Sequence, residues 1–560
     1  MKHRPLFFVT VLSLLIAAKL AMTAGAPAPL RFVNAAPNSG LDFRLDNGAT
    51  AEKYQIETLA GGVGVIDFNN DGLPDIYFTN GAKMPAMEKD HPRFFNRLFQ
   101  NLGNGKFKDV TIQASVQGSG FCTGVAVGDY DGDGFQDIFL CCRPNNILYR
   151  NRGDGKFIEV TGKAGLEGQF SGGQKLWSIA AGWLDYDNDG RLDLFVANYC
   201  DWSPTKNPAC LDRRGIRFYC DPRRFKGLPN SLFRNNGDGT FTDVSEKTGI
   251  ASVSGYGMGV AFADYNGDGF PDIFVANDTV RNQFFENDGH GKFTEKALRK
   301  GVAYREDGLA ISGMGVDFRD FDNDGLPDLF VTALSSETWP LYRNLEGGGF
   351  EDITLASGVG QHASRMSGWS NGIFDFDNDG LKDLYAARSH VLDNVDVVMR
   401  KPYREPNALF LNLGDKQFRN ASAEVGADFA RADVRRGSAF ADFNGDGTVD
   451  IVTSVIGGPA ELLVNEPSQR SNWILLRLVG KVSNRDGIGA AIKIVDASGL
   501  TQHNHVTTSV GYASASDSGV HFGLGTAKKI KLIEIRWPTG RIQALRDVAV
   551  NQVLKVTEAN

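Results

Sequence analysis

One nine-residue pattern recurs along the sequence and constrains its fold more than any other feature. The pattern, Asp-x-[Asp/Asn]-x-Asp-Gly-x-x-Asp, occurs seven times, and the copies start at Asp67, Asp129, Asp185, Asp264, Asp320, Asp375 and Asp442. Consecutive copies are 55 to 79 residues apart. Regular recurrence at this scale is typical of a repeat architecture, in which each copy belongs to one supersecondary unit.

Each copy lies between two runs with strand character. A run of small and apolar residues precedes the pattern, as at 257–262, and a short β-branched or aromatic run follows it, as at 272–276. A second pair of runs, joined by a Gly-rich hairpin, completes each unit, as at 230–244. Four antiparallel strands in each of seven units predict an all-β fold, a seven-bladed β-propeller that spans residues 29–467.

The seventh unit lacks its fourth strand. Residues 461–465 supply the third strand, but Glu466 and Pro467 follow with no strand pattern after them. Residues 30–34 carry a matching pattern before the first acidic loop. We expect this segment to complete the seventh blade and close the ring, because closure removes an open sheet edge.

The first 26 residues have the features of a secretory signal peptide. Lys2, His3 and Arg4 precede an apolar run at 6–18. The protein is therefore expected to be secreted, periplasmic or held at the cell surface. No later run is long and apolar enough to predict a membrane span after signal removal. The net charge of −8 argues against nucleic acid as a partner.

The repeated loops have the chemistry of a calcium site. Positions one, three, five and nine carry oxygen-bearing side chains, which suit a hard cation that takes six to eight oxygen ligands, and the glycine at position six permits a sharp turn. Flanking strands exclude an EF-hand. We predict up to seven structural calcium ions; plain Asp-Gly turns are the alternative, which seven copies disfavour. The predicted ligands are Asp67, Asn69, Asp71 and Asp75; Asp129, Asp131, Asp133 and Asp137; Asp185, Asp187, Asp189 and Asp193; Asp264, Asn266, Asp268 and Asp272; Asp320, Asp322, Asp324 and Asp328; Asp375, Asp377, Asp379 and Asp383; Asp442, Asn444, Asp446 and Asp450.

A long connection in the third unit is the candidate partner surface. It separates Asp193 from Asn230 by 37 residues, and the matching connections of units one and six are also long. All three are expected on the face opposite the acidic loops, where long loops on a rigid scaffold commonly carry function. The alternative is that the loop packs on its own propeller. We predict contact with an extracellular protein or glycan, an anionic one included, through Trp202, Arg213, Arg217, Tyr219, Arg223 and Arg224.

Six cysteines in an exported chain predict disulfides. Cys210 and Cys220 are expected to close the long third loop. Cys122 could pair with Cys141 or Cys142, and the sequence does not choose between them. Two histidines, 503 and 505, alternate on one predicted strand, and we expect solvated polar residues there rather than a metal pair.

The repeats resemble FG-GAP/VCBS repeats, the type found in the head of integrin α subunits. Residues 472–560 resemble an ASPIC/UnbV domain, through the motifs at 484–490, 511–512, 521–525 and 537–540. Together these features resemble the cartilage acidic protein-like family. The resemblance implies an integrin α head-like propeller followed by a small β-sandwich-like domain at 472–560.

These observations predict an exported, calcium-binding propeller that acts as an extracellular binding or adhesion module, without catalytic residues. One alternative is a propeller enzyme, a polysaccharide lyase or hydrolase, with its site in the axial funnel. Such an enzyme should bring Lys, His, Tyr or Glu residues from outside the repeat to the funnel mouth. A second alternative is an accessory protein in biosynthesis, against which the export signal counts.

Overall fold

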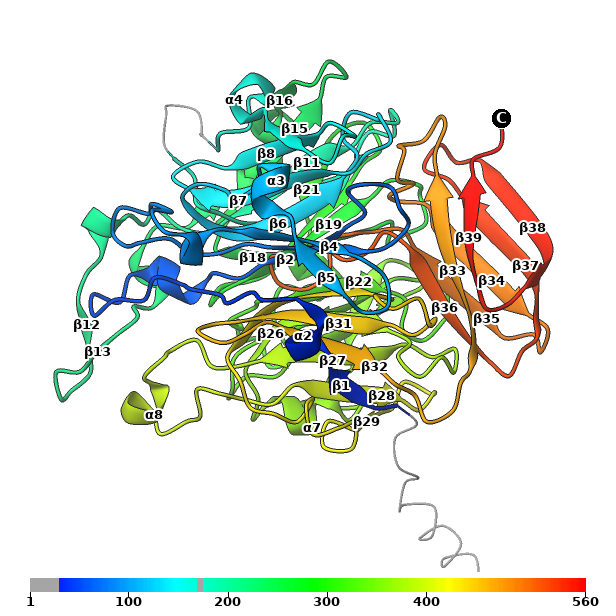
Figure 1. Cartoon of the computed structure of the whole chain (residues 1–560). Coiled ribbons are helices and arrows are strands. Elements are labelled where there is room, and N and C mark those ends of the chain that lie inside the picture. The colour runs from blue at the N-terminus through cyan, green and yellow to red at the C-terminus, as the bar shows by residue number, and fades with distance from the viewer. Residues whose placement is uncertain (1–29, 169–174) are drawn as a thin grey trace, which may run out of the picture.

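The computed structural model describes residues 30–168 and 175–560 and shows an all-β molecule (Figure 1). Four-stranded antiparallel sheets follow one another along most of the chain, each with an acidic loop between its first two strands. The propeller-like fold predicted from the repeats is confirmed. The predicted signal peptide lies outside the described residues.

Within the described residues, seven of these sheets form the propeller, and we number them as blades in the order of their acidic loops. Each blade is given from its innermost strand to its outermost. Blades one to four are, in turn, β2 (Val63–Ile66), β3 (Asp75–Phe78), β4 (Arg97–Asn101) and β5 (Phe107–Asp109) for blade one; β6 (Phe121–Gly128), β7 (Asp137–Arg143), β8 (Ile147–Asn151) and β9 (Phe157–Glu159) for blade two; β10 (Ser178–Leu184), β11 (Asp193–Asn198), β15 (Ser231–Asn235) and β16 (Phe241–Asp243) for blade three; and β18 (Gly257–Ala263), β19 (Asp272–Asn277), β20 (Gln283–Asn287) and β21 (Phe293–Glu295) for blade four. Blades five to seven are β22 (Val316–Arg319), β23 (Asp328–Val331), β24 (Leu341–Leu345) and β25 (Gly349–Asp352) for blade five; β26 (Gly368–Phe374), β27 (Asp383–Arg388), β28 (Ala408–Asn412) and β29 (Phe418–Asn420) for blade six; and β30 (Arg435–Ala441), β31 (Asp450–Val455), β32 (Glu461–Asn465) and β1 (Phe32–Asn34) for blade seven.

The ring closes through the N-terminal strand, as predicted. Strand β1 pairs antiparallel with β32, with Phe32 opposite Asn465 and Asn34 opposite Leu463. Phe32 is buried, and its ring centroid lies 5.2 Å from that of Phe429. Each innermost strand contacts the innermost strand of the next blade, and β30 contacts β2. Apolar packing and strand pairing therefore both join the two ends of the propeller.

A repeated side-chain contact links each blade to the one before it. In blade four, the buried Asp272 accepts hydrogen bonds from the backbone N–H of Asn287 at 2.9 Å and of Tyr265 at 3.3 Å. The side-chain amide of Asn287 in turn donates to the carbonyl of Tyr186, in the acidic loop of blade three, at 2.9 Å. The equivalent amide bond is made by Asn101, Asn151, Asn235, Asn344, Asn412 and Asn465.

Six short helices of the described chain follow the outermost strands of the blades, and a seventh, α8 (Val395–Val398), lies in the connection between β27 and β28. The six are α2 (Ala36–Ser39), α3 (Thr111–Ala114), α4 (Thr161–Ala164), α5 (Ser245–Thr248), α6 (Ala297–Lys300) and α7 (Val359–Ala363). No helix among the described residues is long and apolar enough to cross a membrane.

Residues 472–560 form a second, smaller β unit, which we call the tail domain. Its two sheets have the strand orders β36-β33-β39 and β35-β34-β37-β38. Apolar side chains of both sheets share one buried cluster, as expected for a sandwich-like domain. The strands are β33 (Asn472–Val479), β34 (Ala491–Asp496), β35 (Thr501–His505), β36 (Val520–Gly525), β37 (Lys529–Arg536), β38 (Ile542–Ala549) and β39 (Gln552–Thr557).

The connection between β35 and β36, residues 507–517, enters the propeller and lies along its axis; we call it the axial segment. Ala515 exchanges backbone hydrogen bonds with β2, and Gly511 does so with β22. The hydroxyl of the buried Tyr512 donates to the carbonyl of Leu59 at 2.7 Å. A Cβ atom on Gly511 would lie 2.2 Å from the Ser370 hydroxyl, so only glycine fits there. The tail domain and the propeller therefore form one packed unit.

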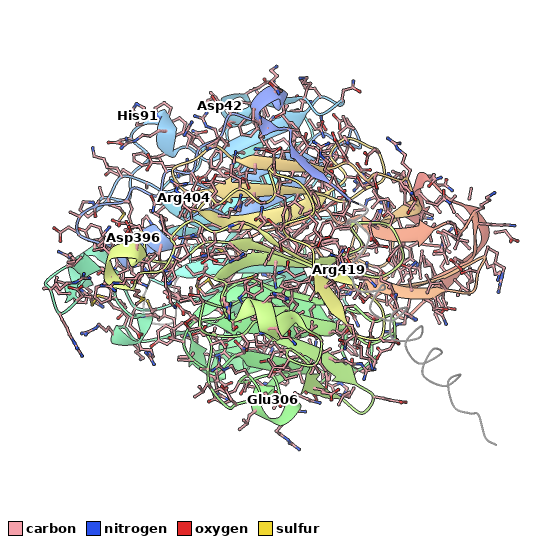
Figure 2. The ribbon with its side chains drawn as sticks, turned by 90° about the horizontal axis from the view of Figure 1, so that it is seen from below. Asp42, His91, Glu306, Asp396, Arg404 and Arg419 are labelled. Carbon is pink, nitrogen blue, oxygen red and sulfur yellow. A yellow bond between two sulfur atoms is a disulfide. The ribbon has the colours of Figure 1, made fainter. Side chains whose placement is uncertain are left out.

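Different parts of the chain lie on the two faces of the propeller. The tail domain lies over the acidic loops, whereas β12 (Cys210–Leu211), β13 (Arg217–Phe218) and α8 project from the opposite side (Figure 1). At right angles to this view, Asp396 of α8 and His91 of the blade-one connection again lie on the side away from the tail domain (Figure 2). The long connections therefore form the face opposite the acidic loops.

Removing residues 1–34 should destabilise the propeller, whereas removing residues 1–29 should not. The longer truncation deletes β1 and leaves the edge of β32 unpaired. It also removes the Phe32 ring that packs against Phe429. We expect a lower melting temperature and concentration-dependent aggregation, measured by thermal unfolding and light scattering. Equal stability of the two truncated proteins would contradict closure by β1.

Candidate functional site

The backbone of each acidic loop turns its side-chain oxygens inward. In blade three, Asn188 and Gly190 adopt left-handed conformations with φ of 54° and 84°. Asp185 accepts hydrogen bonds from the backbone N–H of Asp189 and of Gly190, both at 3.0 Å. Asparagine and glycine tolerate this conformation, which explains the glycine at position six of the pattern.

The structure brings the first, third and ninth aspartates together. In four loops a carboxylate oxygen from each of these positions lies within 4.8 Å of the other two. These groups are Asp129, Asp131 and Asp137; Asp185, Asp187 and Asp193; Asp320, Asp322 and Asp328; and Asp375, Asp377 and Asp383. The fifth-position aspartates lie outside these groups, and one oxygen of each binds its own loop, as Asp133 accepts from Phe135 N at 3.0 Å.

The loop carboxylates are crowded and poorly solvated. Burial raises the pKa of Asp75 to about 8, and burial together with the nearby Asp486 carboxylate raises the pKa of Asp129 to about 7. One buried oxygen each of Asp187, Asp264 and Asp320 has no hydrogen-bond partner among the described residues. A hard divalent cation would satisfy these oxygens and offset the repulsion, so the residues present fit calcium.

Three blades contain an arginine that offsets part of this charge, a feature that the sequence analysis missed. Arg343 of β24 contacts Asp322 at 2.8 Å and Asp324 at 2.7 Å. The same position holds Arg150 in blade two and Arg234 in blade three. In blade six it holds Leu411. The blade-six loop therefore combines four aspartates with no arginine ion pair among the described residues, which makes it a strong candidate for a bound cation.

In chelator, the protein should become less stable as the pH rises from about 5 to about 8. Because burial lifts the pKa of Asp75, Asp129 and Asp442 in the folded state, that state binds more protons than the unfolded chain in this range. The free energy of unfolding then falls as the pH rises. Excess calcium should remove this trend in a thermal unfolding series, and an unchanged trend would contradict cation binding by the loops.

Arg343→Leu should lower the stability of the chelator-treated protein by about 1 kcal/mol, because it leaves the Asp322 and Asp324 charges without a partner. Arg343→Lys keeps the charge and is the matched control. Calcium should narrow the difference between the two variants. Denaturant unfolding measures the stability of each variant in chelator and in calcium. Equal stability of Arg343→Leu and the parent in chelator would show that Arg343 does not stabilise the acidic loop.

The tail domain contacts the acidic loops directly. The Asp486 carboxylate accepts from Asp129 N at 2.8 Å, and Arg536 pairs with Asp264 at 2.7 Å. The expectation that His503 and His505 are both solvated is wrong for His505. This side chain is buried, its Nε2 lies 3.1 Å from the Phe262 carbonyl, and burial lowers its pKa to about 3. His503 is half-buried beside Gly325.

The blade-three loop, residues 199–230, is anchored by distant segments. A disulfide joins Cys210 to Cys220, as predicted, next to the paired strands β12 and β13. Arg217 pairs with Glu52 at 2.6 Å, and its carbonyl accepts from the Asn394 side chain at 2.9 Å. The segment between β1 and β2 and the blade-six connection therefore hold this loop on the propeller, which agrees with the alternative that it packs on its own scaffold.

Two residues of the predicted partner surface are buried instead. Trp202 is fully buried, and its indole N–H donates to Asn207 at 2.9 Å. Tyr219 is 4% exposed, and its hydroxyl donates to Glu57 at 2.9 Å. The prediction that Trp202 and Tyr219 contact a partner is therefore corrected, since both aromatic side chains stabilise the loop from within.

The predicted arginines of this loop differ in their partners. Arg217 is engaged by Glu52, and Arg223 pairs with Asp221 at 2.5 Å. Arg213 and Arg224 are exposed, as is Lys226, and none of the three forms an ion pair within residues 30–168 and 175–560. A second disulfide joins Cys122 to Cys142, while Cys141 and Cys200 are buried free thiols.

Fold and site together define a propeller of acidic-loop repeats whose axis is filled by a C-terminal domain. Matches to the FG-GAP-like repeat cover more than half of the chain, at residues 67–140, 131–196, 221–275, 264–331, 320–386 and 394–453. Residues 480–560 match the domain described as ASPIC and UnbV. The chain belongs to the family of FG-GAP-like repeat proteins, which confirms the resemblance seen in the sequence.

Similar proteins and structures span most of the chain. Cartilage acidic protein 1 of Mus musculus is 24% identical over 96% of this chain and 78% of its own length. The Homo sapiens protein of the same name is 25% identical over 96% of this chain and 77% of its own length. A lectin of Burkholderia pseudomallei aligns with a TM-score of 0.40 and 10% identity over 73% of this chain and 96% of its own. A rhamnogalacturonan lyase aligns with a TM-score of 0.36 and 14% identity over 78% of this chain and 75% of its own.

Proposed function

We propose that this protein is an exported, calcium-stabilised propeller that acts as an extracellular binding or adhesion module. Its partner, a protein or a glycan with anionic groups, would contact the face that carries the blade-three loop. Two disulfides and the relatives named cartilage acidic protein 1 support an extracellular setting.

Calcium would have a structural role in this proposal. Each ion would be held by the first, third and ninth positions of an acidic loop, which lie next to the contacts between blades. When bound, calcium would supply positive charge that allows the buried carboxylates to ionise without mutual repulsion. Extracellular calcium modules bind at about 0.1–1 mM, so this stabilisation would be present outside the cell.

The observation that carries the binding proposal is that a pre-ordered loop presents three cations without an ion pair in the described part of the chain. Arg213, Arg224 and Lys226 are exposed and form no ion pair with any residue that the structure describes, on a loop that a disulfide and two neighbouring connections hold in place. A loop that is already ordered loses little conformational entropy on binding. Unpaired guanidinium and ammonium groups favour carboxylate, sulfate or phosphate groups on the partner.

The filled axis favours a binding role over an enzyme in the funnel. Residues 507–517 occupy the axis from the acidic-loop side, and Tyr512 extends far enough to contact Leu59. Polar residues from outside the repeat do converge near the other end, among them Glu57, Tyr219 and Arg436. Glu57 and Arg436 are fully buried and Tyr219 nearly so. Glu57 accepts hydrogen bonds from the hydroxyls of Thr50 and Tyr219, and Arg436 donates to the Thr58 carbonyl and the Ser389 hydroxyl.

A screen against an array of glycans, sulfated ones included, and a panel of extracellular proteins tests the proposal in calcium buffer. For any anionic partner found, replacing Arg213, Arg224 and Lys226 with Ala should weaken binding at least about 10-fold and flatten its salt dependence. The matched control replaces the exposed Lys108, Lys163 and Lys247 with Ala, which changes the net charge equally. Full affinity in the loop variant would contradict this placement of the partner.

A further inference from the structure

A cleft of about 380 Å³ lies between the acidic loops of blades three to five and the tail domain. The propeller side includes Asp264, Pro271 and Leu326, and the tail side is formed by β34, β35 and β37. Its volume falls within the range of about 300–1,000 Å³ that is usual for small-molecule sites, which often lie between domains. The cleft is on the opposite face from the blade-three loop.

The strand register fixes which tail residues face the cleft. Lys493 of β34 lies opposite His503 on one side and opposite Glu534 on the other. In the next row, Ala491 lies opposite His505 and Arg536. Alternate residues such as Ile492 and Ile533 belong to the tail domain's core, so one face of this sheet is apolar and the other presents a row of polar groups to the cleft.

Two charged groups in this row have no partner among residues 30–168 and 175–560. Arg536 is bound by Asp264 and by the carbonyl of Gly267. Lys493 and Glu534 are half-buried and line the cleft, yet neither makes an ion pair or side-chain hydrogen bond in the described part of the chain. Opposite charges on neighbouring strands stabilise a sheet when they pair. Their lack of partners leaves a positive and a negative group side by side for a ligand.

Part of the remaining wall of the cleft is apolar, next to the acidic-loop carboxylates of Asp185, Asp264 and Asp320 that also line it. Pro271, Leu326 and Pro327 contribute from the propeller, and Pro538 contributes from the tail domain. Such a wall favours a ligand with a compact aliphatic portion. The His503 imidazole adds one donor and one acceptor beside the charged pair.

We propose that this cleft binds a small zwitterion with an apolar side chain, of the class of the aliphatic α-amino acids. Lys493 would contact the ligand's carboxylate, Glu534 its ammonium group, and the prolines and Leu326 its side chain. A purely anionic ligand would be repelled by Glu534 and a purely cationic one by Lys493. The proposed ligand satisfies both charges at once and leaves neither half-buried group unpaired.

Isothermal titration of the whole mature protein with L-leucine in calcium buffer tests the proposal. We expect saturable binding to the parent, and at least about 10-fold weaker binding of 4-methylpentanoate and of 3-methylbutylamine, which each lack one charge. Because these analogues are tested on the unmodified protein, this part of the test does not depend on the folding of a variant. Equal affinity for leucine and for either analogue would overturn the proposal.

Two variants assign the charges. Lys493→Met should reduce leucine affinity at least about 10-fold and remove the preference for leucine over the amine, and Glu534→Gln should remove the preference for leucine over the carboxylate. Lys555→Met, an exposed site on β39, is the matched control. Unchanged leucine binding in both variants, or no saturable binding up to about 50 mM, would overturn the proposal. Neither outcome bears on the partner face, which lies on the other side of the propeller.

Discussion

The rest of the structure depends on the backbone hydrogen bonds that the buried aspartate at the ninth position of each acidic loop accepts. Both oxygens of Asp272 accept backbone hydrogen bonds, one from the loop itself and one from the third strand of the same blade. The residue that supplies the second bond, Asn287, donates its side-chain amide to the loop of the preceding blade. The equivalent bond from Asn101 reaches Phe443 of blade seven, so the series continues around the ring.

Loop charge and blade packing are therefore parts of one network. A buried carboxylate is stable only when its hydrogen bonds and nearby charges compensate for lost solvation. Here the backbone supplies the hydrogen bonds, arginines supply some charge in blades two, three and five, and a divalent cation would supply the remainder. The tail domain adds contacts to the same loops through Asp486 and Arg536, so loops, ring and tail are joined by one continuous set of contacts.

Regular local patterns account for what the sequence predicts correctly. Strand runs, the displaced fourth strand at residues 30–34 and the Cys210–Cys220 pair depend on spacing and alternation, which are visible along the chain. Burial in long loops depends on distant residues instead. Tyr219 is buried because its hydroxyl contacts Glu57, 162 positions away. The composition of the loop therefore suggested a surface role for this residue, which its packing excludes. The axial position of Tyr512 and the burial of His505 escape prediction for the same reason.

The most direct test of this account is the calcium stoichiometry of the mature protein, measured by equilibrium dialysis at about 1 mM free calcium followed by elemental analysis. The account predicts several ions per chain, and about one fewer when Asp375 and Asp377, in the blade-six loop with its four aspartates, are both replaced with Asn. A protein that is folded and carries no calcium under these conditions would contradict the central claim that the acidic loops are cation sites.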